Sequence, residues 1–153
     1  MISISEILMP ASVNLDLSSS TLPAAVEELL ASLRGDTRVS DWEALRSSVV
    51  SQSAPSLETD SCAITIAHGR TEAVGSLVMA AGVSMQGFDT AESKKKVRLV
   101  FVAGIPASFN NEYLRVVGSI ARICKKPGFL QKLLASKTPS NFIQFLEEGE
   151  GQL

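Results

Sequence analysis

Apolar residues recur at two different spacings along this chain, and each spacing predicts a different kind of element. Residues 25–33 carry apolar side chains three or four positions apart, which predicts an amphipathic helix that ends at Gly35. A second helix is predicted directly after Ser40 or Asp41, since either side chain can cap its first turn. Both helices precede the most β-like part of the sequence.

The same helical spacing returns towards the C-terminus. It predicts a long helix whose inner face includes Leu114 and Cys124, followed by a short helix over residues 129–135. A last helix is predicted after Thr138 or Ser140, either of which can cap it. The C-terminal third of the chain is therefore expected to be helical.

Short apolar and β-branched runs between these helical regions predict strands. Residues 62–67 form one such run, and residues 97–105 are almost continuously apolar, as is typical of a strand covered on both faces. Weaker patterns predict strands over residues 13–17 and 76–84, and the lysine run 94–96 is expected in a solvated turn. Helices at both ends with strands between them predict one α/β layered domain, which suits a chain of 153 residues.

Composition and charge exclude several classes of function. Hydrophobic residues make up 45% and charged residues 20%, and a net charge of −2 disfavours nucleic-acid binding. The longest apolar stretch is too short to span a bilayer, the first residues lack a signal-peptide pattern, and Cys62 and Cys124 lie in apolar settings. We therefore expect a cytoplasmic protein without membrane insertion. One histidine and two separated cysteines make no zinc pattern, and phosphate-binding glycine loops are absent, so no metal or cofactor is expected.

The residues with the most evident chemistry follow the predicted strand 62–67. His68 is the only histidine in the chain, Gly69 allows the backbone to turn, and Arg70 adds a permanent cation. Ligands of α/β sheets bind at the carboxyl ends of strands, where this histidine is expected. A lone histidine after a strand is more often a loop residue or a hydrogen-bonded rim residue than a reactive group.

A single histidine supports few reactions. Residues 58–61 offer carboxylates and a hydroxyl, but no nucleophile-elbow motif is present, so a hydrolase with His68 as its base is a weak alternative. A histidine ring nitrogen can also accept a phosphoryl group and pass it on to a partner. Such a site requires access for the partner, N–H donors and a cation, and Gly69 and Arg70 meet these needs.

Four segments resemble one known family in their order and spacing. They are residues 63–70 (Ala-Ile-Thr-Ile-Ala-His-Gly-Arg), residues 97–106 (Val-Arg-Leu-Val-Phe-Val-Ala-Gly-Ile-Pro), Tyr113-Leu114, and residues 140–146 (Ser-Asn-Phe-Ile-Gln-Phe-Leu). The chain resembles the enzyme IIA domain of the fructose/mannitol type from the bacterial phosphotransferase system, and in particular its nitrogen-regulatory branch. The resemblance runs from near Ile4 to about Leu146.

This resemblance implies a mixed sheet with helices on both faces, and His68 as the phosphoryl acceptor. The implied function is a phosphoryl carrier or a phospho-dependent regulator, and whether it is an enzyme depends on phosphoryl transfer. The implied donor is a histidine phosphocarrier protein, and the implied target is a permease component or a regulatory protein. The enzyme IIA-like domain is expected over residues 1–147, and the acidic tail 148–153 is expected to fray.

The chain departs from the family pattern around the histidine. Ala67 stands where the family has proline, Gln52 where it has an arginine that helps hold the phosphoryl group, and Tyr113 where it has a second histidine. Residues 56–61 contain no glycine where the family is glycine-rich. One lost donor costs roughly 3 kcal/mol of transition-state stabilisation, which slows phosphoryl transfer. We expect Arg70 and Tyr113 to substitute in part for the lost donors. The alternative is a degenerate regulatory module that binds a partner without carrying phosphate.

Overall fold

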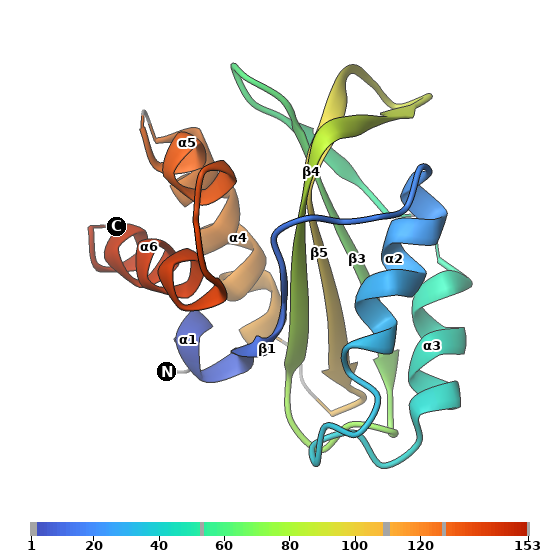
Figure 1. Ribbon diagram of the computed structural model, residues 1–153. Coiled ribbons are helices and arrows are strands. Elements are labelled where there is room, and N and C mark those ends of the chain that lie inside the picture. The colour runs from blue at the N-terminus through green and yellow to red at the C-terminus, as the bar shows by residue number, and fades with distance from the viewer. Residues whose placement is uncertain (1–2, 53, 109–110, 127, 153) are drawn as a thin grey trace.

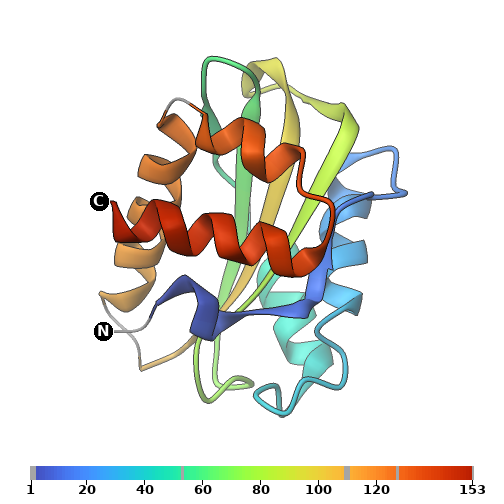
Figure 2. The ribbon, with the colours of Figure 1, turned by 60° about the vertical axis from the view of Figure 1, so that its left-hand side comes forward.

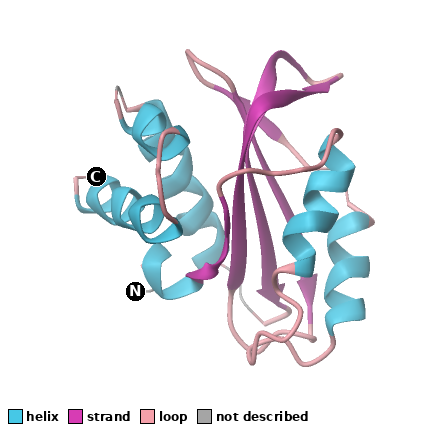
Figure 3. Ribbon diagram, in the orientation of Figure 1, coloured by secondary structure: helices cyan, strands magenta, loops and turns pink. Residues whose placement is uncertain are grey.

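The computed structural model describes residues 3–52, 54–108, 111–126 and 128–152, and over these residues five strands form one mixed sheet with helices on both faces (Figure 1; Figure 3). The strands are β1 (Leu8–Asn14), β2 (Ser56–Glu58), β3 (Ala63–Thr71), β4 (Val78–Thr90) and β5 (Ser93–Pro106). The helices are α1 (Ile4–Ile7), α2 (Leu22–Ala31), α3 (Trp42–Val50), α4 (Glu112–Lys125), α5 (Phe129–Leu134) and α6 (Pro139–Gly151). The predicted single α/β domain with a mixed sheet is confirmed.

Strand β5 lies at the centre of the sheet, whose strand order is β1-β4-β5-β3-β2. It runs parallel to β3 and antiparallel to β4, and Ala103 pairs with His68 on one side and with Met79 on the other. Parallel neighbours and helices on both faces require a strand that is apolar on both sides. The near-continuous apolar run of residues 97–105 meets this requirement.

Each face of the sheet has its own apolar core, which is covered by its own group of helices. Helices α2 and α3 cover one face, and α1, α4, α5 and α6 cover the other (Figure 1). Successive side chains of a strand point to opposite faces. In β3, Ile64 and Ile66 pack into the α4–α6 core, whereas Ala63 and Ala67 pack into the α2–α3 core.

Three helices begin at capping residues, and Asp41 and Thr138 are among the caps that the sequence pattern predicts. Thr21, Asp41 and Thr138 each accept, through a side-chain oxygen, the backbone N–H of the residue three positions further on. Each such contact contributes about 1 kcal/mol to helix stability. Pro23 and Pro139 lie in the first turns of α2 and α6, where a missing backbone N–H has no cost.

The strands differ in their bounds from those that the sequence pattern predicts. Strand β1 covers Leu8–Asn14, so it begins before the predicted strand 13–17 and ends within it. Strand β3 continues past residue 67 to Thr71, because β5 pairs with it as far as Pro106. Strand β5 begins at Ser93, so the lysine run 94–96 lies in a strand and not in a turn. The short strand β2 lies in a polar stretch for which the hydrophobic pattern predicts no strand.

Two differences concern the C-terminal helices. The buried face of α4 includes Val116, Ile120 and Ile123, and Leu114 points outward with 65% of its surface exposed. Helix α6 continues through residues 148–151, where the sequence predicts a fraying tail, and residue 153 lies outside the described part. The Glu150 carboxylate accepts the backbone N–H of Ile4 at 3.2 Å, which ties the end of α6 to α1 beside it (Figure 2).

Candidate functional site

His68 lies on β3, three residues before the strand ends, and its side chain faces α4. The alternation that directs Ile64 and Ile66 into the α4–α6 core places His68 on the same face of the strand. Its neighbour across the sheet is Ala103 of β5, which is small. The sheet therefore presents the imidazole at the carboxyl end of two parallel strands, where α/β folds place their ligands.

The His68 ring packs against Tyr113 in the first turn of α4. The two ring centroids are 4.8 Å apart and the ring planes are tilted by 38°. The Nδ1 atom of His68 is buried and has no hydrogen-bond partner among the described residues. Burial raises the pKa of Tyr113 to about 12, so its hydroxyl keeps its proton at neutral pH. The structure thus brings together His68 and Tyr113, two of the residues that the sequence singles out.

Gly69 serves close packing and not a turn, because the β3 backbone remains extended there. A Cβ atom at this position would lie 2.6 Å from the carbonyl carbon of Ser48 and 2.7 Å from the nitrogen of Val49. Real Cβ atoms do not approach backbone atoms so closely. Glycine therefore lets α3 lie directly on β3 behind the histidine.

Arg70 is exposed and lies on the same face of β3 as His68 by the strand alternation. It pairs in register with Ile105 of β5. Leu114 follows Tyr113 on α4 and exposes an apolar side chain beside the aromatic residue. The helical spacing of the sequence predicts Leu114 on the inner face of α4, and the structure places it on the surface.

Gln52 lies at a groove on the other side of the sheet from the His68–Tyr113 pair. It follows the end of α3 and lines a groove together with Ala67, which packs into the α2–α3 core on the opposite face of β3 from His68. Strand β2 pairs only with residues 63–65 of β3, so β2 does not cover the edge of β3 next to His68. A side chain at position 52 would have to reach around this edge to approach the imidazole.

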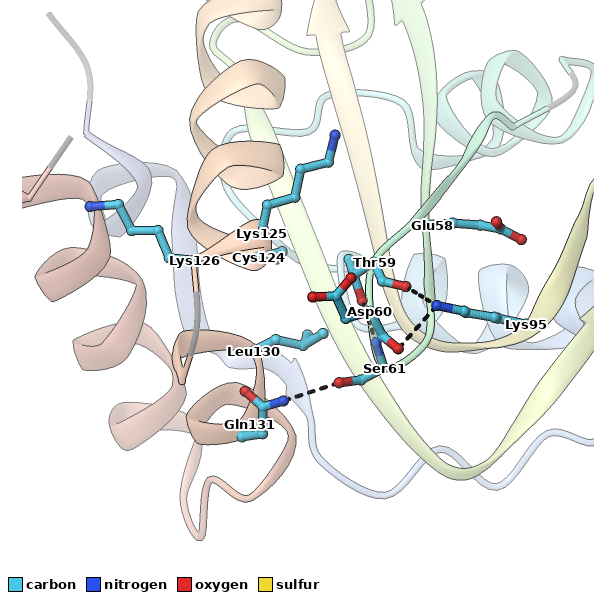
Figure 4. A pocket seen from close by; sticks show the side chains of 10 residues that line it. All are labelled: Glu58, Thr59, Asp60, Ser61, Lys95, Cys124, Lys125, Lys126, Leu130 and Gln131. Carbon is cyan, nitrogen blue, oxygen red and sulfur yellow. Dashed lines mark hydrogen bonds between the residues drawn. The ribbon is translucent and has the colours of Figure 1, made fainter.

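The loop before β3 forms a separate cavity of about 370 Å³ between the start of β3, the end of α4 and α5 (Figure 4). Lys95 donates from Nζ to the carbonyl oxygens of Thr59 and Asp60 at 2.5 and 3.0 Å, and Gln131 donates to the Ser61 hydroxyl at 3.0 Å. This cavity lies at the amino end of β3, whereas His68 lies near the carboxyl end. Residues 58–61 therefore do not assemble a catalytic triad with the histidine.

Metal and membrane chemistry find no support in the described residues. Their His, Cys, Asp and Glu side chains form no group of three or more that could hold a metal ion. Within the described part of the chain, every helix is too short or too polar to traverse a lipid bilayer. The chemistry available at the site is thus that of the imidazole, the phenol of Tyr113 and the guanidinium of Arg70.

Solved structures share this fold over most of their length. The nitrogen regulatory protein IIA-Ntr from Neisseria meningitidis is 22% identical, with a TM-score of 0.75 over 94% of this chain and 98% of that chain. IIA mannitol from Escherichia coli is 19% identical, with a TM-score of 0.65 over 89% of this chain and 96% of that chain. The complex of enzyme IIAMtl and phosphorylated enzyme IIBMtl from Escherichia coli contains a chain that is 16% identical, with a TM-score of 0.69 over 93% of this chain and 99% of that chain.

The family comparison covers nearly the whole chain. Residues 6–149 match the family described as phosphoenolpyruvate-dependent sugar phosphotransferase system, EIIA 2. The matched segment includes all five strands of the described part, together with His68 and Tyr113. The chain therefore belongs to the EIIA 2 family of the phosphoenolpyruvate-dependent sugar phosphotransferase system, a class of phosphoryl carriers and regulators.

Proposed function

We propose that this EIIA 2 protein accepts a phosphoryl group on His68 from a histidine phosphocarrier protein and passes it on or signals through it. The observation that supports this most directly is the position of the chain's only histidine. It lies at the carboxyl end of two parallel strands and packs against Tyr113, which the exposed Leu114 follows in sequence. A phosphoryl acceptor must be fixed in direction and still accessible to a partner protein, and this position offers both.

The burial of Nδ1 favours Nε2 as the reacting atom. Nδ1 is enclosed and has no hydrogen-bond partner among the described residues, so a phosphoryl group bonded there would have no space. In the transfer step, the lone pair of Nε2 forms a bond to phosphorus while the phosphorus–nitrogen bond in the donor's phosphohistidine breaks. The electron pair of that broken bond returns to the donor's imidazole, and the new phosphoramidate keeps enough energy to transfer again.

The neighbouring residues have different roles in this proposal. The Arg70 guanidinium neutralises charge on the phosphoryl oxygens, and the protonated Tyr113 hydroxyl donates a hydrogen bond to one of them. Gly69 lets α3 pack closely behind the strand that carries the imidazole. Gln52 lines the groove on the other face of β3, so in this proposal it has no part in holding the phosphoryl group.

We infer partners of two kinds. The exposed Leu114 beside the rings offers an apolar contact for the donor protein. A related enzyme, IIAMtl, forms a complex with phosphorylated IIBMtl, so a IIB-type permease component is one candidate target for this chain. The similarity to IIA-Ntr supports a nitrogen-regulatory role as the other candidate. Both roles place the protein in the cytoplasm.

The test is the intact mass of the protein after incubation with phosphoenolpyruvate, the general phosphotransferase enzyme and the phosphocarrier protein. We expect a gain of one phosphoryl group that is lost in acid. The chain has a single histidine, so acid lability together with the absence of any gain in the His68→Ala variant assigns the group to His68. A folded wild-type protein that gains no mass would overturn the proposal.

The placement of Gln52 favours one second candidate. If the lost arginine has silenced the site, the protein is a regulatory module that binds its partner without phosphate. Partner affinity would then be equal for wild type and for the His68→Ala variant, and both would remain unphosphorylated. A comparison of the two proteins by titration calorimetry with the partner separates this candidate from a carrier, whose affinity depends on phosphorylation.

A further inference from the structure

A groove with a volume of about 440 Å³ lies on the opposite side of the sheet from the His68–Tyr113 pair. It is bordered by the first turns of α2, the end of α3, the middle of β3 and the connection between β4 and β5. Figure 1 shows α2 and α3 side by side on this face of the sheet. The volume falls within the range of small-molecule sites in proteins, about 300–1,000 Å³.

The walls of the groove are mainly apolar. Val26, Val49 and Ala67 are buried in the α2–α3 core and face the groove from three different elements. Val50 lies at its mouth with 45% of its surface exposed, which extends the apolar surface out to solvent. An apolar body would displace water from these side chains at a gain of about 25 cal/mol per Å² buried.

The charged groups that line the groove are carboxylates. Both oxygens of Glu27 accept hydrogen bonds from Arg46, at 2.8 and 2.5 Å, so its charge is largely offset. Glu92 lies in the β4–β5 connection, and none of the ion pairs found among the described residues involves it. No lysine, arginine or histidine is among the described residues that line the groove. With the Glu27 charge offset by Arg46, the Glu92 carboxylate is the charge among the described lining residues that an occupant would meet, and a carboxylate favours a cation.

We propose that this groove binds a small molecule with an apolar body and an ammonium group. The body lies on Val26, Val49 and Ala67, and the ammonium group lies at the mouth near Glu92 and the Thr90 hydroxyl. The proposal does not depend on phosphoryl transfer, because His68 does not line the groove. Its test can therefore fail or succeed whatever the outcome of the mass measurement described above.

The test uses three six-carbon probes: hexylammonium, hexanol and hexanoate. Each is titrated into ¹⁵N-labelled protein at pH 7 and low salt, and binding is followed by amide shifts in α2, α3 and β3. We expect hexylammonium to bind about fivefold more tightly than hexanoate, the size of effect that one exposed charge gives. The preference should shrink at high salt, since exposed charges are screened.

Three variants locate the site. Glu92→Gln should make hexylammonium and hexanol bind equally, whereas Glu43→Gln, an exposed change at the other end of α3, should leave the preference intact. Ala24→Leu adds a side chain at the exposed wall of the groove on α2 and should abolish binding of all three probes. The proposal is overturned if no probe shifts the groove amides, or if hexanoate binds the wild type as tightly as hexylammonium.

Discussion

The imidazole of His68 and the phenol ring of Tyr113 lie 4.8 Å apart, centroid to centroid, and join β3 to the first turn of α4. Neither residue is buried completely, and the Nδ1 edge of the imidazole is the enclosed one. The aromatic neighbour therefore limits the rotation of the imidazole and leaves the Nε2 edge as the route of approach. This geometry makes Tyr113 the residue whose substitution is most informative about the proposed acceptor.

We predict that Tyr113→Phe lowers the rate of His68 phosphorylation by roughly tenfold, which corresponds to one lost hydrogen bond to a charged group. The phenylalanine ring keeps the packing against the imidazole, so the thermal midpoint should change little. Tyr113→Ala should lower the rate further, because the imidazole then also loses its neighbour. Rates are measured as the appearance of phosphorylated protein by intact mass at fixed donor concentration.

Leu114→Ala is the matched control for donor docking. It removes the exposed apolar side chain next in sequence and should raise the donor concentration needed for half-maximal rate without lowering the maximal rate. If Tyr113→Phe reacts as fast as wild type, the hydroxyl has no part in holding the phosphoryl group, and only the ring contact matters.

Arginine at position 52 should increase the rate of phosphorylation. β2 leaves the edge of β3 beside His68 uncovered, so a long side chain that starts from the exposed position 52 can reach around it. A guanidinium is a stronger donor to phosphoryl oxygens than an amide. We expect Gln52→Arg to raise the rate about tenfold in the same assay.

Ser51→Arg is the control for this change, because it adds the same charge one residue earlier, also at an exposed position. A general attraction between the added charge and the donor would accelerate both variants equally. An unchanged rate in Gln52→Arg would show that position 52 serves the α2–α3 face alone.

Gly69→Ala should destabilise the protein by about 1–3 kcal/mol, the usual cost of overpacking. The added Cβ would meet the backbone of Ser48 and Val49, so α3 would have to move away from β3. The free energy of unfolding is measured by urea titration. Gly75→Ala is the control, since a Cβ there meets nothing within 4 Å and should leave stability within about 0.5 kcal/mol.

The sequence was most informative where local chemistry decides the structure. The caps at Asp41 and Thr138 are formed within one helical turn, so residue types alone narrow each of them to two candidates. The central position of β5 follows from an apolar run too long for a half-exposed strand. The hydrophobic pattern predicts the elements one by one, whereas the resemblance to the family predicts that the strands form one mixed sheet.

The sequence was least informative where partners distant in the chain decide the structure. Strand β3 extends to Thr71 because β5 offers it partners, which no pattern within residues 62–71 indicates. The outward direction of Leu114 depends on how α4 rotates on the sheet. The separation of Gln52 from the His68 face results from the path of the chain after α3, and spacing along the sequence does not specify that path.

The two cysteines should resist alkylation in the folded protein. Burial raises the pKa of Cys62, and burial together with the nearby Cys62 raises the pKa of Cys124 to about 12. At pH 8 the reactive thiolate of Cys124 is then only about one part in ten thousand, and both side chains are almost inaccessible. Iodoacetamide at pH 8 should add no mass to native protein and two adducts in urea. Rapid addition to native protein would contradict the burial of these thiols.

The pair of Asp36 and Arg38 should make stability depend on pH in the acid range. Arg38 donates from Nε and a terminal nitrogen to the two Asp36 oxygens at 3.0 and 2.7 Å, and its other terminal nitrogen donates to the carbonyl oxygen of Ile7 at 2.9 Å. The hydrogen bonds from Arg38 lower the pKa of Asp36 below its ordinary value, although burial opposes them. The unfolded chain thus binds a proton more readily than the native state. The stabilisation is fully present above about pH 4 and is lost as the pH falls through the lowered native pKa.

We expect Asp36→Asn to reduce the free energy of unfolding by about 2 kcal/mol at pH 7, since it weakens a charge-assisted pair that is largely shielded from solvent. The difference from wild type should be smaller at pH 3, because wild-type Asp36 then becomes partly protonated. Urea titrations of both proteins at the two pH values measure this. Asp89→Asn is the control, since its partner Lys96 and Asp89 itself are exposed and such pairs contribute little. Equal differences at pH 7 and pH 3 would mean that the hydrogen-bond geometry of residue 36, and not its charge, stabilises the turn after α2.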